Sequence, residues 1–292
     1  MLDQLRRIFP SLLMYQETVD LPADGFQWFL TKDHDVIGIA SEELTERDMS
    51  LLAAFLTPYD IKFPMMTEAE RKWKNRIDHP TAANKSISYR FVYFFIQKNQ
   101  LDPHLFREAI HEAFARPIPI IWKNKHEGIL IEEEPSPAED PISYEQIIHV
   151  LMSDLYVKIN FFLGPYVENP VHARDYYEFL VEYAPTAISY SDVPVITFTD
   201  SIPLLFIHQA DSVFLQQFPE MILKEFAGDK EMLATVRTYI QSNMNISVAA
   251  KELFMHRNSL QYRLDKFISR TGIDIRQFRQ AVTVYLALLA RD

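Results

Sequence analysis

The spacing of apolar and polar positions along the chain predicts which segments form strands and which form helices. At the N-terminal end it predicts a small region with both. In FQWFLTKDHDVIGIA (26–40) the apolar positions alternate, which predicts two strands around a KDHD turn. TERDMSLLAAFLTPY (45–59) has helical spacing, with Thr45 as N-cap before an acidic first turn. The polar stretch 65–85 predicts a linker helix followed by a loop. We therefore expect a small N-terminal α/β accessory or sensor unit over residues 1–75.

The middle of the chain alternates between strand-like and helix-like patterns. Strands are predicted in SISYRFVYFFI (86–96), PIPIIWKNKHEGILIEEE (117–134, a hairpin turning near Lys125–Gly128), KINFFLGPYV (158–167) and VPVITFTD (193–200). Helices are predicted in DPHLFREAIHEAFA (102–115), YEQIIHVLMSDLYV (144–157) and HARDYYEFLVEYAPTAI (172–188). The order βαββαβαβ suits an antiparallel or mixed sheet with helices on one or both faces. With a helical stretch over 203–230, it predicts a central domain over 86–225.

The last 62 residues have helical spacing throughout. Four helices are predicted, at 231–243, 247–254, 257–270 and 275–290. The fold class is therefore multidomain α+β, with an all-α C-terminal domain over 231–292. The pair 247–270 fits a helix-turn-helix, in which two short helices cross closely and the second is able to enter the major groove.

Several side chains suit that crossing. Ala250 permits a close approach, and a shared core is expected from Leu253, Met255, Leu260 and Leu264. Leu260, Leu264 and Phe267 follow one helical face. Phe254 stands where a generic helix-turn-helix often has glycine, and there it could plug the turn against the first helix.

Composition excludes several classes of protein. The chain has no cysteine, which excludes disulfides, a cysteine nucleophile and cysteine-based zinc sites, and fits a reducing compartment. Its six glycines are scattered, so a phosphate-cradling loop, a dinucleotide fingerprint and a nucleophile elbow are all missing. No apolar run approaches the roughly 18 residues of a membrane span, and the start does not resemble a signal peptide. We expect a cytoplasmic protein without membrane contact.

Charge is distributed unevenly between the two ends. Residues 231–292 contain nine Lys/Arg and five Asp/Glu, a net +4, which leaves −15 on the preceding 230 residues of a chain whose total is −11. An acidic body with a basic end indicates that the end meets a polyanion.

The second helix of the pair carries the candidate binding residues. The predicted DNA-binding set is His256, Arg257, Asn258, Ser259, Gln261, Tyr262, Arg263 and Lys266. Arginine suits guanine, asparagine and glutamine suit adenine, and lysine suits phosphate. Two members have an alternative role. Arg263 could instead pair with an acid such as Glu252, and for His256 we favour a role as helix N-cap over a phosphate contact.

The same stretch carries a family resemblance. NISVAAKELFMHRNSLQYRLDKFISRTGID (245–274) resembles the C-terminal helix-turn-helix of PucR/CdaR-type bacterial transcriptional regulators. The family pattern Ala-x-x-Leu-φ-φ-His-Arg-Asn-Thr-Leu-x-Tyr-Arg-Leu (φ, apolar) is met at Ala250, Leu253, Phe254, Met255, His256, Arg257, Asn258, Leu260, Tyr262, Arg263 and Leu264. Ser259 replaces the usual threonine and keeps the hydroxyl.

The resemblance extends upstream and implies a function. TAISYSDVPVITFTDSIPLLFI (186–207) and the preceding βαββαβαβ order are similar to the family's degenerate GGDEF-like central domain. The implied function is a sequence-specific, effector-responsive transcriptional regulator that binds double-stranded DNA. Because such a motif usually reads two half-sites, a homodimer is expected. Residues 1–75 depart from the family's larger sensor domains, so the small-molecule effector stays unknown.

A second class of function stays open at this point. Residues 1–230 could be a small-molecule-binding or enzymatic module, with the helical end docking a partner. His104, Glu108 and His111 share one helical face and could bind a metal. A solvated face opposite a buried one (Leu105, Phe106, Ala109, Ile110, Ala113 and Phe114) explains them better, so no metal or cofactor is expected. An active diguanylate cyclase would need paired metal-binding acids and a Gly-Gly turn to seat the nucleotide. The corresponding hairpin turn, NKHEGIL, has one glycine, so we expect no enzyme activity.

Overall fold

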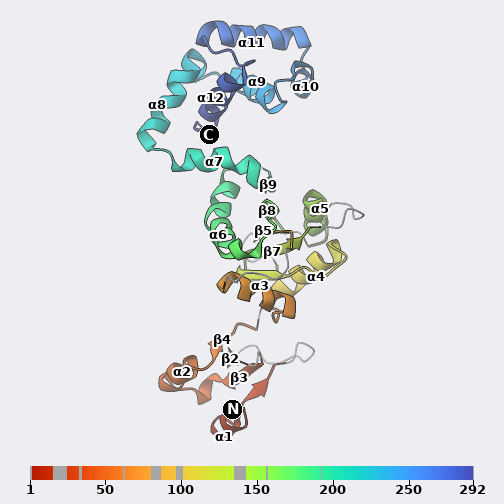
Figure 1. The fold of residues 1–292 in the computed structure, drawn as a ribbon, viewed down its shortest axis with the longest axis vertical. Coiled ribbons are helices and arrows are strands. Elements are labelled where there is room, and N and C mark those ends of the chain that lie inside the picture. Colours follow the sequence, from red (N-terminus) through yellow and green to blue (C-terminus); the bar gives the residue numbers. More distant parts are fainter. Residues whose placement is uncertain are drawn as a thin grey trace. The chain divides into compact units, whose positions relative to one another are not determined.

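A computed structural model describes most of the chain (Figure 1). The described residues are 2–15, 25–32, 35–61, 63–79, 87–96, 101–134, 143–155, 157–191 and 193–291. They form two compact units, Met1–Ile159 with Tyr166–Arg174, and Asn160–Pro165 with Asp175–Asp292. Among the described residues, none of the helices combines the length and the apolar character needed to cross a bilayer.

A small antiparallel sheet forms the N-terminal region. Its elements are α1 (Leu2–Ile8), β1 (Leu13–Met14), β2 (Phe26–Leu30), β3 (Val36–Ala40), η1 (Ser41–Glu43), α2 (Glu46–Ala53) and β4 (Thr57–Pro58). The strand order is β1-β3-β2-β4, and the predicted pair of strands is β2 and β3, although residues 33 and 34 of their turn lie outside the described part. Thr45 caps α2 as expected, in a capping box with Asp48. Phe29, Ile37 and Ile39 lie at the centre of its core.

The predicted linker helix is a packed element, α3 (Glu68–Asp78). Its residue Glu70 is fully buried and accepts hydrogen bonds from three donor atoms: Thr67 N at 2.7 Å, Ile120 N at 2.9 Å and Arg107 Nη2 at 3.2 Å. A buried charge is tolerated only when it is paired and hydrogen-bonded, and Glu70 meets both conditions. The carboxylate therefore holds the start of α3 against the second sheet.

The second sheet has the predicted βαββαβαβ order. Its strands are β5 (Tyr89–Ile96), β6 (Ile120–Asn124), β7 (Glu127–Glu133), β8 (Ile159–Leu163) and β9 (Val195–Thr197). The helices between them are α4 (Pro103–Ala113), α5 (Tyr144–Leu155) and α6 (Ala173–Ser189), with a 3-10 turn, η2 (Pro170–His172), before α6. The strand order is β6-β7-β5-β8-β9; β7 is antiparallel to β5 and β6, whereas β8 and β9 are parallel, so the sheet is mixed.

Two expectations for this region were wrong in detail. The last strand ends at Thr197 rather than 200, because the Thr197 side chain accepts from Asp200 N and starts the next helix. Leu105 of α4 is half exposed, so the buried face of that helix is narrower than predicted; its buried members are Phe106, Ile110 and the C-cap Phe114. The segment PSPAEDPIS (135–143), whose three prolines predict a loop, falls largely on residues 135–142, outside the described part.

One of the candidate metal ligands on α4, His111, contacts the backbone. The His111 ring nitrogen Nε2 lies 3.1 Å from the carbonyl oxygen of Ile118. Within the described ranges, no group of three or more His, Asp or Glu side chains is placed to hold a metal ion.

The rest of the chain is helical, as predicted. Its elements are α7 (Phe198–Gln209), α8 (Ser212–Leu223), η3 (Lys224–Phe226), α9 (Lys230–Gln241), α10 (Ile246–Glu252), α11 (Arg257–Thr271) and α12 (Phe278–Leu289). The last helix begins at Phe278 rather than 275, because Asp274 accepts from Arg276 N and the backbone turns there first. Val236, Phe267 and Val284 come from three helices and meet in one buried core.

Candidate nucleic-acid interface

The crossing of α10 and α11 depends on small residues in the first helix and leucines in the second. Ala249 and Ala250 are both buried. Leu260, Leu264 and Phe267 are buried along one face of α11, as the spacing predicted. Because a methyl side chain lets the two backbones approach, the leucine face packs against α10 and α9 in one core.

The turn between the two helices closes without a glycine. Met255 N donates to the Ala250 carbonyl at 2.8 Å, and Phe254 N donates to the Lys251 carbonyl at 3.2 Å, the two bonds of a Schellman motif. Phe254 occupies the left-handed position of this motif, with φ of 54°. Its side chain is 98% exposed, so the prediction that it plugs the turn is wrong. Met255 was also expected in the shared core, and it lies outside the core cluster, beside α11's exposed face.

His256 starts α11 as its N-cap, the role that we favoured from the sequence. Its Nδ1 accepts a hydrogen bond from Asn258 N at 3.2 Å. A neutral imidazole that accepts at Nδ1 carries its proton on Nε2, so this nitrogen remains a donor. The next three residues, Arg257, Asn258 and Ser259, form the first turn of the helix and are exposed.

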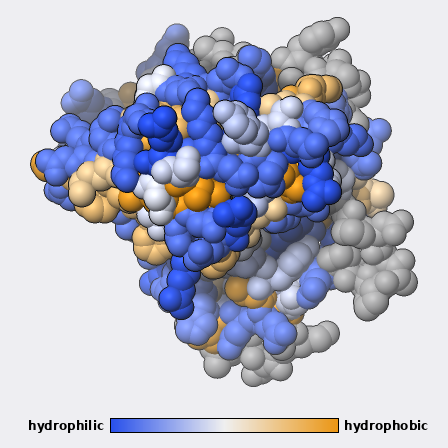
Figure 2. All heavy atoms as spheres, turned by 90° about the horizontal axis from the view of Figure 1, so that it is seen from above, coloured by the Kyte–Doolittle hydropathy of each residue, from blue (hydrophilic) through white to orange (hydrophobic). Residues whose placement is uncertain are grey.

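The exposed face of α11 borders a shallow concave surface of about 680 Å³. Figure 2 is seen from above, the side on which α11 lies in Figure 1, and hydrophilic residues predominate in this view among scattered hydrophobic ones. The concave surface is lined by Asn258, Ser259, Tyr262, Arg263 and Lys266 of α11, by Met255, and by Asp229, Glu231 and Met232 at the start of α9. Five of the eight predicted residues therefore lie together.

Arg263 has an acidic partner, though not the one considered from the sequence. Its Nη2 lies 2.6 Å from Glu231 Oε1, and its Nη1 lies 3.5 Å from Thr235 Oγ1. Glu252 instead accepts from Ser242 Oγ at 3.0 Å. The neighbour of Arg263 comes from the helix that precedes the pair, which spacing within α10 and α11 could not indicate.

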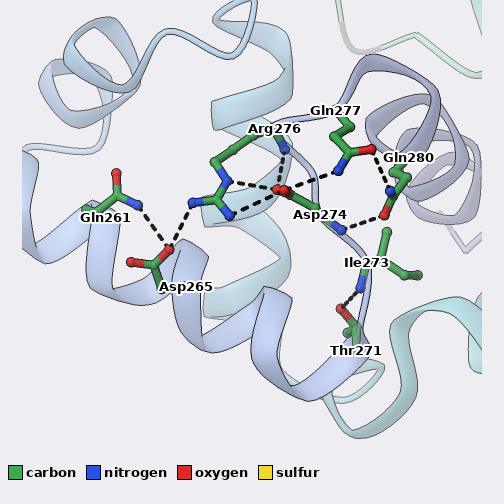
Figure 3. Close-up of polar contacts among 8 residues, drawn as sticks. All are labelled: Gln261, Asp265, Thr271, Ile273, Asp274, Arg276, Gln277 and Gln280. Carbon is green, nitrogen blue, oxygen red and sulfur yellow. Dashed lines mark hydrogen bonds and ion pairs between the residues drawn. The ribbon is translucent and has the colours of Figure 1, made fainter.

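Gln261 belongs to a polar network that joins α11 to the loop before α12 (Figure 3). Its Nε2 donates to Asp265 at 3.0 Å, Asp265 pairs with Arg276 at 3.4 Å, and Arg276 Nε donates to Asp274 at 2.8 Å. The hydrogen bond from Arg276 is the main cause that lowers the pKa of Asp274, and the same bond raises the pKa of Arg276. Gln261 and Arg263 are thus engaged, whereas Arg257 and Lys266 have no ion-pair partner among the described residues.

Similarity to known proteins also indicates a helix-turn-helix at this end of the chain. The model of the PucR C-terminal helix-turn-helix domain matches residues 232–290. The uncharacterized protein YxkF of Bacillus subtilis (strain 168) is 30% identical, over 99% of this chain and 98% of its own length. The proline-responsive transcriptional activator PutR of the same organism is 35% identical over 66 residues, 23% of this chain and 16% of its own. The carbohydrate diacid regulator of Escherichia coli (strain K12) is 32% identical over 66 residues, 23% and 17% of the two chains.

These matches define the class of protein. A chain with this crossing, this turn and this family match is a DNA-binding transcriptional regulator of the helix-turn-helix class. It belongs to the PucR/CdaR-type family of regulators, and its likeness to YxkF runs along almost the whole of both chains.

Proposed function

We propose that the chain binds operator DNA as a homodimer, with the N-terminal turn of α11 in the major groove. The observation that carries the proposal is the first turn of α11, where Arg257, Asn258 and Ser259 are exposed together at the capped start of the helix. In helix-turn-helix proteins the residues at this end of the second helix contact base edges. The contact set is the predicted one, His256, Arg257, Asn258, Ser259, Gln261, Tyr262, Arg263 and Lys266.

Individual roles follow from side-chain chemistry and surroundings. Arg257 suits the two acceptors of guanine, and Asn258 suits adenine. Lys266 lies further along the helix and suits phosphate, as does the Nε2–H of His256. In the unbound protein Gln261 contacts Asp265, and Arg263 contacts Glu231. On binding, both side chains would leave these carboxylates and contact DNA instead.

The remainder of the chain supplies dimerisation and response. We assign residues 1–75 to an accessory or sensor unit and 86–225 to a degenerate GGDEF-like domain that serves as scaffold or relay without nucleotide chemistry. Two half-sites require two copies of α11, so dimer contacts upstream of residue 231 would strengthen binding. The −15 charge upstream against +4 in residues 231–292 supports DNA contact through the C-terminal end alone.

The test starts from DNA fragments that co-purify with the full-length protein. Fluorescence anisotropy would measure binding to a selected fragment and to its scrambled version over a range of salt concentrations. We expect tighter binding to the selected fragment and a linear fall of log K with log salt. Equal, salt-independent binding to both would refute DNA reading and favour a helical end that docks a protein partner. Sedimentation of the complex would give the number of chains per fragment.

A further inference from the structure

A cavity of about 340 Å³ lies in the first compact unit, beside the N-terminal sheet and α3. Small-molecule sites typically measure roughly 300–1,000 Å³ and are mostly apolar with a few polar groups. The apolar part of this wall consists of Leu30, Val36, Pro58, Tyr59, Met65 and Met66. Its size and lining are therefore those of a small-molecule site.

The polar part of the wall comes from one face of α3. Glu70, Trp73 and Ile77 form the buried face of this helix. Arg71 and Lys74 lie three residues apart on another face and line the cavity together with Asn75, Asp78 and the C-cap His79. Because the hydrogen bonds of Glu70 fix the helix from its buried side, both cations are held at the cavity wall.

These two cations have capacity for a further anion. Arg71 Nη1 donates to the Met66 carbonyl at 2.5 Å, one of the five N–H donors of a guanidinium, and no carboxylate pairs with it among the described residues. Lys74 Nζ lies 3.4 Å from Asp78 Oδ1, and both side chains are close to half exposed. An exposed lysine–aspartate pair is weak and screened by solvent, so a ligand carboxylate can compete for Lys74.

A second cavity, of about 190 Å³, adjoins the first and shares four lining residues with it. Pro58, Tyr59, Met66 and Lys74 border both cavities. The smaller one continues to Phe63 and Trp122, whose rings pack edge to face at 5.8 Å. Lys74 therefore lies where a charged head group and an apolar body would meet.

We infer that this cavity binds a small monocarboxylate with an apolar body about the size of an aromatic ring. The carboxylate contacts Arg71 and Lys74, and the body packs against Met65, Met66 and Tyr59. An anion is favoured over a cation because two cations face one acid, Asp78, which Lys74 already contacts. Binding of the monocarboxylate does not require DNA. That this ligand is the effector of a DNA-binding regulator rests on the proposed function.

Calorimetry on the full-length protein tests this with phenylpropionate, phenylpropylamine, phenylpropanol and acetate as probes. We expect phenylpropionate to bind, and the amine and the alcohol to bind at least about tenfold more weakly, since each lacks the charge-assisted hydrogen bonds. Acetate lacks the apolar body and should give no measurable heat. Lys74→Gln and Arg71→Gln should each weaken phenylpropionate binding by about tenfold.

Lys72→Gln is the matched control, because Lys72 lies on the same helix, pairs with Glu68 and does not line the cavity. Equal binding of the acid and the amine, an equal loss in Lys72→Gln, or no binding of phenylpropionate would each overturn the inference. Circular dichroism checks the fold of each variant. If Arg71→Gln perturbs α3, Lys74→Gln still tests the inference, because the Lys74 side chain is exposed and its replacement should not disturb the helix. DNA binding is titrated separately, so its failure would refute the proposed function without touching the carboxylate site.

Discussion

Two helices, α11 and α3, each carry two basic side chains that are candidates for binding an anion, and the surroundings of these side chains differ. On α11, Arg257 and Lys266 are both exposed, and Lys266 borders a shallow concave surface with polar and apolar parts of similar extent. On α3, Arg71 and Lys74 border a cavity whose other walls are apolar. The same residue types therefore suit a long polyanion in one place and a small anion with an apolar body in the other. The shape around a cation, more than the cation itself, decides which ligand it suits.

The largest expected effect concerns how α3 is held. Glu70→Ala should lower the free energy of unfolding of the first unit by about 3–5 kcal/mol, because it leaves the partly buried Arg107 without its acid and Ile120 N without its acceptor. Urea unfolding followed by tryptophan fluorescence is suitable, since all three tryptophans lie in this unit. Glu68→Ala is the control, because its exposed pair with Lys72 is screened by solvent and should contribute far less to stability. Similar losses in both variants would contradict an anchoring role for Glu70.

The next effect concerns the two cations of α11. Arg257→Ala should reduce discrimination between cognate and scrambled DNA by about 1–3 kcal/mol per half-site. Lys266→Ala should weaken both DNAs alike and lower the salt slope by about one unit per contact. Anisotropy titrations at several salt concentrations separate the two behaviours. If Arg257→Ala keeps the cognate-to-scrambled ratio, Arg257 is not a base reader.

A smaller effect concerns the acid beside the interface. Glu231→Gln should tighten DNA binding about two- to fivefold at low salt, because it releases Arg263 and removes a negative charge near the phosphates. Glu225→Gln is the matched control, since Glu225 pairs with Arg270 at the other end of α11. Equal changes in the two variants would mean that only net charge matters and that Arg263 does not reach DNA.

Phe254 offers a test with the opposite sign. Phe254→Gly should raise the free energy of unfolding by about 0.5 kcal/mol, because relief of the left-handed strain, about 1–2 kcal/mol, exceeds the backbone entropy cost of glycine, about 0.5–1 kcal/mol. Phe254→Ala keeps the Cβ and should not gain this stability. Thermal unfolding of the three proteins by circular dichroism makes the comparison. A loss of stability in the glycine variant would show that the exposed ring has an intramolecular role.

The smallest effect is expected in acid. Since the Arg276 hydrogen bond lowers the pKa of Asp274 below its usual 3.8, the folded state favours the ionised carboxylate. The resulting stability is present above pH 3.8 and is lost as the pH falls through the lowered value. Asp274→Asn should therefore melt below the wild type at neutral pH, and the gap should narrow below about pH 4. A gap that does not change with pH would exclude a contribution from this charge.

Local patterns in the sequence determined most of the secondary structure and the identity of the DNA-binding end. Three features depend only on residues that are near in sequence, so the sequence alone predicts them: the leucine spacing of α11, the cap at Thr45 and the βαββαβαβ order. The same is true of His256, whose capping contact is two residues away. The eight candidate DNA-binding residues follow from the exposed face of one helix, and their individual contacts stay predictions.

Tertiary structure decided which side chains meet across long stretches of chain. The partner of Arg263 is 32 residues away, and the acceptor for Ile120 N is 50 residues away, at Glu70. Phe254 was misplaced because its conformation depends on the closing bonds of the turn rather than on its apolar character. The cavity beside α3 is lined by residues of β2, β3 and β4 and by one face of α3, a helix that the sequence indicated only as a linker. Periodicity reports which face of an element is apolar, whereas a concave site exists only once separate elements have packed against each other.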